Sequence, residues 1–438
     1  MKKQSTIKKS KNIILNVILA RFQKGSFFRN LSVVMTGTAT AQLILFAIMP
    51  IISRLFTPED FGVFSSFHAL LMVISAGVTL QYAQAVVLPK HHKEGIVLLF
   101  IACLSVVLIT AISVVFVGVF PSMVQSVINA SNYWFLFFVP MAIFANGLNQ
   151  AFQSWCIRVK AFKATSQSQV IRSIILIVIW LVFGFWQVGA PGLVLGIIIA
   201  DISANLNLLH YVRQGINANK SSLTWQKIKA KTHEYIDFPL FAAPQNIINA
   251  LSQGLPVFLL AFYYGIGVAG AYAFGIRILY APINFLLTPL RQVLFQKATE
   301  TYNNNGNLYS LFMKITGGLM ALAFLPCVIL FIWSPSIFPF IFGTEWQEAG
   351  VYARWLILWL FVGFSNVPAV LCARIIRQQR NLFIFDVLLL IFRLITLIIG
   401  GMNYTPVTTI IIFSTLGFIS NLFLILCIGK LLHLEYAR

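Results

Sequence analysis

Long runs of apolar residues, separated by short polar stretches, repeat along the whole chain. We identify twelve runs of roughly 20 residues or more, the length at which a helix crosses a bilayer. They cover 31–55, 60–83, 95–119, 132–155, 168–187, 190–212, 239–263, 268–290, 308–334, 350–373, 381–401 and 405–429. The runs are apolar on nearly every face and do not alternate, so they predict membrane-spanning helices and not barrel strands.

The clearest local signal lies between the first two predicted spans. Thr57 can cap a helix, Pro58 suits the first helical position, and Asp60 lies three residues after the cap. The turn is therefore short, and the two flanking helices run antiparallel. A weaker version occurs about 206 residues later, where Pro256–Tyr272 leads from an apolar helix through a short turn to a Gly-x-aromatic triplet. The two similar hairpins indicate a duplicated helical bundle.

A polar, basic stretch between the sixth and seventh spans divides the chain. We interpret it as a linker between two six-helix halves, or as a simple tether. The predicted divisions are a basic N-terminal segment (1–30), a first lobe (31–212), the linker (213–238), a second lobe (239–429) and a tail (430–438). Six spans followed by an inside linker preserve orientation, so the halves are parallel repeats.

Composition supports a lipid environment for most of the chain. Hydrophobic residues make up 59% of the 438 residues, charged residues only 10%, and the mean hydropathy is +0.87. Soluble domains carry about 25% charged residues. The fold class we expect is therefore an all-α polytopic membrane protein with little room for a soluble domain.

The net charge of +20 is distributed on one side of the predicted spans. Of the 31 Lys and Arg residues, 26 fall in the termini and in every second loop, whereas the other loops hold Glu59, Asp60, Glu345 and Glu348 and no lysine. The positive-inside rule then places both termini in the cytoplasm. This topology explains the charge without a nucleic-acid partner.

Two arginines lie well inside predicted spans. A charge at the bilayer centre costs about 2.5–3.5 kcal/mol on insertion scales, so Arg277 and Arg393 must face protein or a water-filled cavity. They either pair with an aspartate, such as Asp201 or Asp386, or line a cavity and attract an anionic group. Arginine suits phosphate because its planar fork donates two parallel hydrogen bonds.

Three further arginines lie near span ends. Arg54, Arg172 and Arg354 are long enough to place their charges at the membrane interface, which explains them without a functional role.

Two stripes of amide side chains follow helical spacing on the fourth and seventh spans. The members are Asn146, Asn149, Gln150 and Gln153 on the fourth, and Gln245, Asn246, Asn249 and Gln253 on the seventh. Amides hold membrane helices together, with an average coupling of about 0.6 kcal/mol. They are equally suited to hydrogen-bonding the hydroxyl groups of a sugar, and the sequence leaves both interpretations open.

Several signatures of catalysis are missing from the sequence. There is no phosphate-binding Gly-x4-Gly-Lys-Ser/Thr stretch, no cluster of His and Cys ligands, and no nucleophile elbow. We therefore expect neither an enzyme nor a bound metal or cofactor.

Five segments carry a resemblance to a known family. They are Phe28–Asn30, Pro50–Gly62, Val86–Lys90, Ala269–Phe274 with Arg277, and Phe342–Trp346. In these segments the chain resembles bacterial polysaccharide biosynthesis membrane proteins, the oligosaccharide-lipid flippases of the multidrug/oligosaccharidyl-lipid/polysaccharide superfamily.

The resemblance implies a fold and an activity. The fold is twelve helices in two six-helix lobes around a V-shaped central cavity. The activity is alternating-access transfer of an undecaprenyl-diphosphate-linked oligosaccharide repeat unit from the cytoplasmic to the periplasmic leaflet of the inner membrane, for O-antigen, capsule or exopolysaccharide synthesis. The implied partners are this lipid-linked oligosaccharide, membrane lipids, and the polymerase and chain-length proteins of glycan assembly.

The resemblance also implies roles for individual residues. Arg277 matches the place of a cavity arginine that binds diphosphate. With this match we further expect Arg393 or Arg54 to assist Arg277, and the amide stripes to hold the sugars. Asp201 and Asp386 are candidates for ion coupling. The related lipid II flippase has a cavity arginine on its second helix. The corresponding predicted helix here has no arginine within Asp60–Gln81, which argues against a peptidoglycan precursor as cargo.

Three alternatives remain at this stage. A cation-coupled multidrug exporter of the same superfamily predicts acidic residues in the cavity, whereas the spans hold more Arg than Asp. A glycan polymerase or ligase predicts a large outer loop, and the outer loops here are short. The last alternative is a membrane scaffold without transport.

Overall fold

The computed structural model describes residues 27–129, 132–218, 223–304 and 306–436. Within these residues the chain is helical and forms no strand. Ten helical segments among them are long and apolar enough to cross a membrane, and Thr40–Leu55, the second part of the helix Phe27–Leu55, is a shorter apolar stretch. The protein is therefore an all-α polytopic membrane protein, as the hydrophobic pattern predicts, while the count of twelve spans stays a prediction. Most of the predicted basic segment 1–30 lies outside the described residues.

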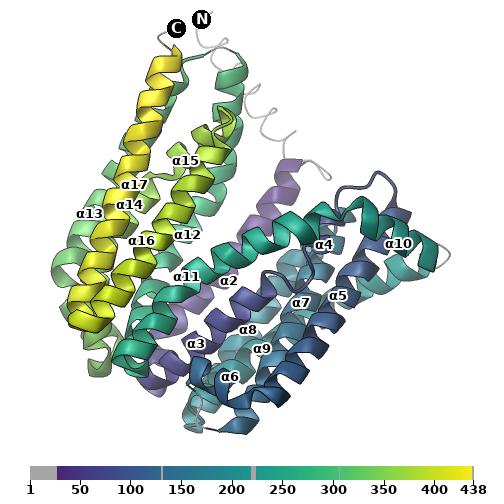
Figure 1. Ribbon diagram of the computed structural model, residues 1–438, viewed down its shortest axis with the longest axis horizontal. Helices are drawn as coiled ribbons and strands as arrows, with labels where there is room; N and C mark the ends of the chain where they lie inside the picture. The colour runs from purple at the N-terminus through teal and green to yellow at the C-terminus, as the bar shows by residue number, and fades with distance from the viewer. Residues whose placement is uncertain (1–26, 130–131, 219–222, 305, 437–438) are drawn as a thin grey trace, which may run out of the picture.

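The helices of the first half form one arm of the molecule (Figure 1). They are α2 (Phe27–Leu55), α3 (Pro58–Ser75), α4 (Tyr82–Ala85), α5 (His92–Val119), α6 (Pro121–Ile128), the 3₁₀ turn η1 (Tyr133–Phe137), α7 (Phe138–Arg158), α8 (Phe162–Phe185) and α9 (Ala190–Ala218). We call this arm the N-lobe. The short helix α10 (Trp225–Glu234) packs against α5 at one end of it.

Most helices of the second half form the other arm, which we call the C-lobe, while the first of them, Ala243–Tyr264, runs diagonally from the N-lobe across to it (Figure 1). A π-helical turn, η3 (Phe238–Ala242), leads into it. Its helices are α11 (Ala243–Tyr264), α12 (Ile266–Asn303), α13 (Leu308–Phe342), the 3₁₀ turn η4 (Thr344–Trp346), α14 (Gln347–Ser365), α15 (Val367–Ile375), α16 (Gln379–Asn403) and α17 (Pro406–Tyr436).

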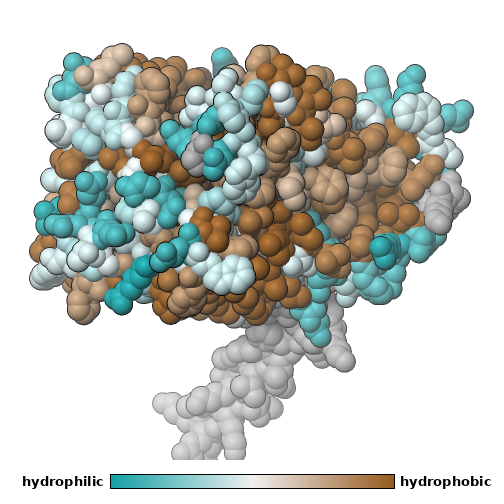
Figure 2. Space-filling model, turned by 90° about the horizontal axis from the view of Figure 1, so that it is seen from below, coloured by the Kyte–Doolittle hydropathy of each residue, from teal (hydrophilic) through white to brown (hydrophobic). Residues whose placement is uncertain are grey.

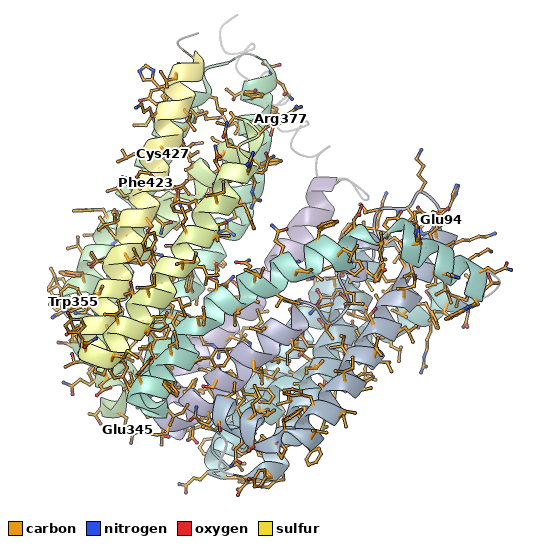
Figure 3. All side chains as sticks on the ribbon, in the orientation of Figure 1. Glu94, Glu345, Trp355, Arg377, Phe423 and Cys427 are labelled. Carbon is orange, nitrogen blue, oxygen red and sulfur yellow. The ribbon has the colours of Figure 1, made fainter. Side chains whose placement is uncertain are left out.

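The two lobes meet at one end and diverge toward the other, which gives the molecule a V shape (Figure 1). Charged residues differ between the two ends. Figure 3 places Glu345 at the closed end, whereas Arg377 lies at the open end of the C-lobe. Arg377 belongs to a loop that the charge pattern predicts on the inner side, so the open end is the predicted cytoplasmic end.

Aromatic packing joins the lobes at the closed end. The ring of Phe61 on α3 packs edge-on against Phe274 and Trp346, at centroid distances of 5.3 and 5.1 Å, and those two rings stack at 3.9 Å. Ser53 on α2 donates a hydrogen bond to the carbonyl of Phe342 (2.9 Å), and the Trp346 indole donates one to the carbonyl of Ser53 (2.7 Å). These contacts seal the side opposite the opening.

Two glycines allow α3 and α12 to approach closely at this end. A Cβ on Gly62 would lie 2.1 Å from the carbonyl oxygen of Ile266, and one on Gly270 would lie 1.8 Å from that of Pro58. Gly270 follows Gly62 by 208 residues, and Ile266 follows Pro58 by the same number. The contact is therefore reciprocal, as expected where two equivalent hairpins of a duplicated bundle face each other.

The turn between α2 and α3 forms as its sequence predicts. The Thr57 hydroxyl accepts from the amide of Asp60 (3.2 Å), and the Asp60 carboxylate accepts from the amide of Thr57 (3.1 Å), which completes a capping box. Asp60 also accepts from the amide of Ala190 (2.9 Å), at the start of α9. One carboxylate thus accepts hydrogen bonds from backbone amides at the starts of two helices. The contact with Ala190 could not be predicted from the local sequence, because Ala190 lies 130 residues away.

Hydrophobic residues cover much of the outer surface, as lipid exposure requires. Figure 2, which views the molecule from below Figure 1, shows broad apolar areas, with hydrophilic groups at the edges and within the left half of this face. Residues such as Phe262 and Phe340 are 78% and 83% exposed, which only a membrane makes favourable.

Candidate functional site

A cavity of about 910 Å³ lies on the inner side of the C-lobe, among α11, α12 and α14–α17. Its lining extends from Pro256 and Phe413, within the helices, to Arg374 and Gln379, where α15 ends and α16 begins. That limit is close to Arg377, which Figure 3 places at the open end. The cavity therefore reaches toward the open side of the V.

The charged residues of this lining are mainly cationic. They comprise three arginines, Arg291, Arg374 and Arg393, and one carboxylate, Asp386. The side chains of Arg291, Arg374 and Asp386 are exposed, and that of Arg393 is half-buried. A low-dielectric wall with a surplus of positive charge concentrates anions.

Arg393 lies beside two aromatic side chains of the cavity wall. Its guanidinium lies 5.0 Å from the ring centroid of Trp359 and 5.7 Å from that of Phe413. Its Nε atom is buried without a hydrogen-bond partner among the described residues, and no ion pair joins it to Asp386. Cation–π contacts stabilise the charge but use none of its N–H groups, so Arg393 retains donors for a ligand.

Amide side chains of α11 form another part of the same wall. Gln245, Asn249 and Gln253, spaced four residues apart, are exposed and line the cavity, while Asn246 is not among the lining residues. The cavity also contains Asn366 and Asn421, whose side chains are joined by a 2.8 Å hydrogen bond. The seventh-span stripe therefore faces the cavity with three of its four members.

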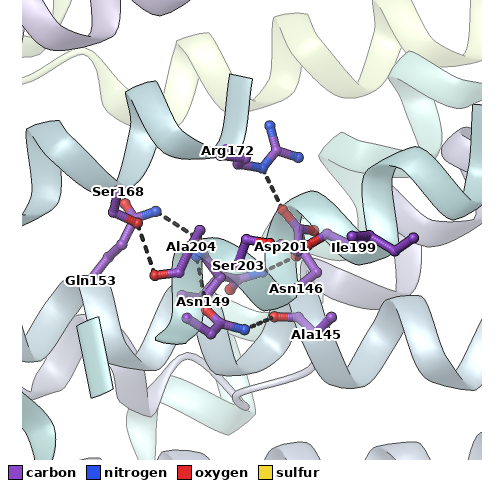
Figure 4. A network of polar contacts seen from close by, with 12 residues as sticks. Ala145, Asn146, Asn149, Gln153, Ser168, Arg172, Ile199, Asp201, Ser203 and Ala204 are labelled. Carbon is purple, nitrogen blue, oxygen red and sulfur yellow. Dashed lines mark hydrogen bonds and ion pairs between the residues drawn. The ribbon is translucent and has the colours of Figure 1, made fainter. Parts of the chain in front are cut away.

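The stripe on the fourth predicted span has a different environment. Asn149 donates to Asn205 (2.9 Å), which donates to the carbonyl of Ala145 (2.8 Å), and Gln150 donates to Asn146 (2.9 Å) and to the carbonyl of Ser75 (3.0 Å). Gln153 completes the network by donating to Asn149, as Figure 4 shows. These amides join α7 to α9 and α3 inside the N-lobe and do not line the C-lobe cavity.

Asp201 forms an ion pair with Arg172, from α9 to α8 (Figure 4). Its carboxylate is 1% exposed, and the Arg172 side chain is 26% exposed. A residue 29 positions later thus supplies a counter-charge for Arg172, which the sequence explained only by a position near the membrane interface. The pair places Asp201 away from the cavity lining.

Arg277 lies on α12 but faces the N-lobe. Its guanidinium lies over the rings of Trp180 (5.1 Å) and Phe64 (5.6 Å), and no described carboxylate lies within ion-pair distance. The residue is half-buried and is not part of the C-lobe cavity lining. The structure thus separates Arg277 from Arg393, although both lack an acidic partner among the described residues.

The remaining arginines near span ends differ from each other. Arg54 is exposed at the end of α2, at the closed end of the V, and lies outside the cavity. Arg354 donates to the carbonyls of Phe331 and Ile332, both at 2.9 Å, and thereby joins α14 to α13.

Sequence reasoning missed Arg291 and Arg374 because it assigned both to inner loops. Helix α12 continues to Asn303, well beyond the predicted span end at 290, and carries Arg291 on the cavity side. Tyr280, Asn284 and Arg291 all line the cavity and share one helical face by their spacing. This polar face was visible in the sequence and could have indicated that Arg291 belongs to the helix and faces the cavity.

Comparisons with known proteins agree with this architecture. A family model described as "Polysaccharide biosynthesis protein" matches residues 51–351, more than half of the chain. No curated protein matches the sequence.

Three solved structures share the fold at low sequence identity. The lipid II flippase MurJ, in an inward closed conformation, aligns with a TM-score of 0.68 and 15% identity, covering 89% of this chain and 87% of MurJ. An inward-facing multidrug resistance MATE family transporter of the MOP superfamily gives 0.64 and 13%, covering 90% and 99%. A MOP superfamily transporter from Pyrococcus furiosus gives 0.58 and 13%, covering 93% and 96%.

Proposed function

Because this chain belongs to the family of polysaccharide biosynthesis proteins, we propose that it is a flippase for a lipid-linked oligosaccharide. Its cargo is an undecaprenyl-diphosphate-linked repeat unit, which it moves from the cytoplasmic to the periplasmic leaflet of the bacterial inner membrane. Both termini are cytoplasmic, and the V-shaped structure is the state open to the cytoplasm, where such a cargo is assembled.

The observation that carries this proposal is the charge of the C-lobe cavity. Three arginines and one aspartate line it, and a diphosphate is the part of the cargo that matches a positive surplus. Each guanidinium donates in a planar fork that fits phosphate oxygens. Arg374 and Arg291 meet the diphosphate first, and Arg393 receives it between Trp359 and Phe413.

The sugars occupy the neighbouring wall. Gln245, Asn249 and Gln253 supply amide donors and acceptors toward the cavity, which is the chemistry that hydroxyl groups require. Aliphatic and aromatic residues such as Leu389 and Phe383 complete the lining on the α16 side. The polyprenyl chain remains in the lipid outside the lobes.

Arg277 serves a later step of the same cycle in this proposal. It lies on the N-lobe side of α12, held over Trp180 and Phe64. When the lobes rock, this surface becomes the inner wall of the state open to the periplasm, and Arg277 then holds the diphosphate before release. Arg54 has no part in this proposal because it is exposed at the closed end.

For ion coupling we propose Asp386 and not Asp201. Asp386 lines the cavity, two helical turns from Arg393 on the same helix, whereas Asp201 is already paired with Arg172. A carboxylate in the cavity can exchange a cation for the charge of the cargo, which a carboxylate committed to a structural ion pair cannot do.

The test compares two variants in a strain that lacks the native gene. Arg393→Gln removes the deepest cavity charge, and Arg380→Gln removes an exposed arginine outside the cavity lining. A hydrogen bond to a charged group contributes about 1.5–3 kcal/mol, so we expect Arg393→Gln to lower the transfer rate about 10- to 150-fold. The measurements are surface glycan and the lipid-linked repeat units that accumulate, identified by mass.

Membrane levels of both variants must equal those of the wild type. Normal glycan synthesis by Arg393→Gln would refute the role of the cavity charge. Accumulation of lipid-linked units only with Arg393→Gln would support it. A drug-susceptibility change with intact glycan would favour a multidrug exporter instead, although one carboxylate among three arginines is a poor site for cationic drugs.

A further inference from the structure

A second cavity lies in the N-lobe, separate from the proposed cargo site. It has a volume of about 670 Å³ and is formed where α7 and α9 end and α5 begins. Its lining includes His92, Trp155, Arg158, Lys160 and Gly215. Figure 3 places Glu94, two residues along α5 from His92, at the end of the N-lobe that lies far from helices α13 to α17. None of these residues takes part in the proposed transport.

The walls of this pocket are held by specific contacts. Arg158 donates to the carbonyls of Val86 (2.7 Å), Pro89 (2.9 Å) and His91 (2.7 Å), which fixes the loop before α5. The indole of Trp155 is buried and donates to the carbonyl of Tyr211 (3.1 Å). The pocket therefore exists before any ligand arrives, so little ordering cost opposes binding.

Gly215 and Lys160 shape the pocket through their backbones. A Cβ on Gly215 would lie 2.3 Å from the Trp155 ring, so only glycine lets α9 pack this closely against Trp155. Lys160 adopts a left-handed conformation (φ 58°) in the turn that ends α7, and its side chain is exposed at the rim.

The charge of the pocket is positive and lacks an acidic counterpart in its lining. Arg158 and Lys160 carry full charges, and His92 adds a ring that can donate or accept. The nearby Glu94 is engaged by Lys231 (2.9 Å), which also binds Glu234 (2.7 Å). Carbonyl oxygens hold the Arg158 side chain but do not cancel its charge, so an anion is favoured here.

We propose that this pocket binds a phosphate group, and that the group is the headgroup phosphate of an anionic phospholipid. Basic pockets between the cytoplasmic ends of membrane helices are suited to such headgroups. Ile157, next to Arg158, is 42% exposed, so acyl chains find apolar surface beside the polar pocket. The bound lipid ties the ends of α5, α7 and α9 together. A free phosphate ion offers the same chemistry without the apolar contact.

The experiment uses the full-length protein purified in mild detergent, with native mass spectrometry as the readout. The probes are phosphatidylglycerol and phosphatidylcholine of equal acyl length. Wild type should retain phosphatidylglycerol over phosphatidylcholine, and Lys160→Asn should lower its retention about fivefold, as expected for one basic charge. Asn tolerates the left-handed backbone of this position, so the fold is kept. Lys163→Asn, an exposed lysine outside the pocket lining, is the matched control.

A second arm separates the two sources of phosphate. Inorganic phosphate at millimolar concentration should leave phosphatidylglycerol bound. Displacement of the lipid by inorganic phosphate would overturn the lipid assignment, and equal losses with Lys160→Asn and Lys163→Asn would overturn the site. Melting temperatures, measured with and without phosphatidylglycerol, show whether each variant is folded. Glycan synthesis does not enter the readout, so the result is independent of the proposed flippase activity.

Discussion

The substitution Gly270→Ala tests whether the α3–α12 contact closes the outer side of the protein. The added Cβ would lie 1.8 Å from the Pro58 carbonyl oxygen and 2.7 Å from the Gly62 amide nitrogen. A carbon and a carbonyl oxygen approach to about 3.3 Å at the closest. The two helices must therefore separate by about 1.5 Å at this point, and the clash is with backbone, which no rotamer change relieves.

The cost of this overlap shifts the conformational equilibrium. Overpacking costs about 1–3 kcal/mol, which changes the ratio of two states about 5- to 150-fold. Only the state with the outer side closed suffers the clash, so Gly270→Ala should favour the state that is open there. Gly62→Ala should act in the same direction, because its Cβ would lie 2.1 Å from the Ile266 carbonyl oxygen.

The assay measures the distance between spin labels on Ser126 of α6 and Glu345 of η4, both exposed at the closed end. The five native cysteines are free and are replaced first. Gly317→Ala is the control, because a Cβ there meets no atom within 4 Å. Gly270→Ala should move the distance distribution to longer values and Gly317→Ala should not. An unchanged distribution in Gly270→Ala would show that this contact does not close the outer side.

Two further predictions concern the N-lobe. Asp201→Asn should lower the free energy of unfolding by about 3 kcal/mol. This is the lower end of the cost of breaking a buried ion pair, because the Arg172 side chain is partly exposed. Thermal unfolding measures the loss. No loss of stability would mean that solvent already screens the pair. For α10, burial opposes the charge of Lys231, but its hydrogen bonds to Glu234 and Glu94 outweigh burial and raise its pKa. Lys231 helps to hold α10 against α5 through its ion pair with Glu94. This contribution to the stability of the contact is complete below the ordinary lysine pKa of about 10.4, and it is lost as pH rises through the raised pKa. Protease cleavage around α10 should therefore increase only at the alkaline end, and Lys231→Gln should abolish this pH dependence. Equal cleavage of wild type and Lys231→Gln at every pH would contradict the docking role.

The hydrophobic pattern predicted the helices well because lipid imposes a strong constraint on the chain. Every backbone polar group must be satisfied within its own segment, so length and apolarity define a span almost without context. The capping box at Thr57 was equally readable, since its partners lie within three residues. The inside charge bias likewise required no tertiary information.

The roles of the buried polar residues were not readable in the same way. In a span that is apolar on most faces, periodicity does not mark which face meets another helix and which meets a cavity. Each amide stripe places four amides within about two turns of one helix, yet one stripe forms a hydrogen-bonded network inside the N-lobe and the other faces the C-lobe cavity.

Sequence alone determined that this chain is a bundle of membrane helices whose basic residues are concentrated in alternate loops, and its motifs identified the family. Tertiary structure decided that Asp201 is committed to Arg172 and that Arg291, Arg374 and Arg393 share one cavity while Arg277 faces Trp180. The physical reason is that partners of a buried charge are set by how helices cross and by their rotation about their own axes. These depend on packing between residues that are far apart in the sequence.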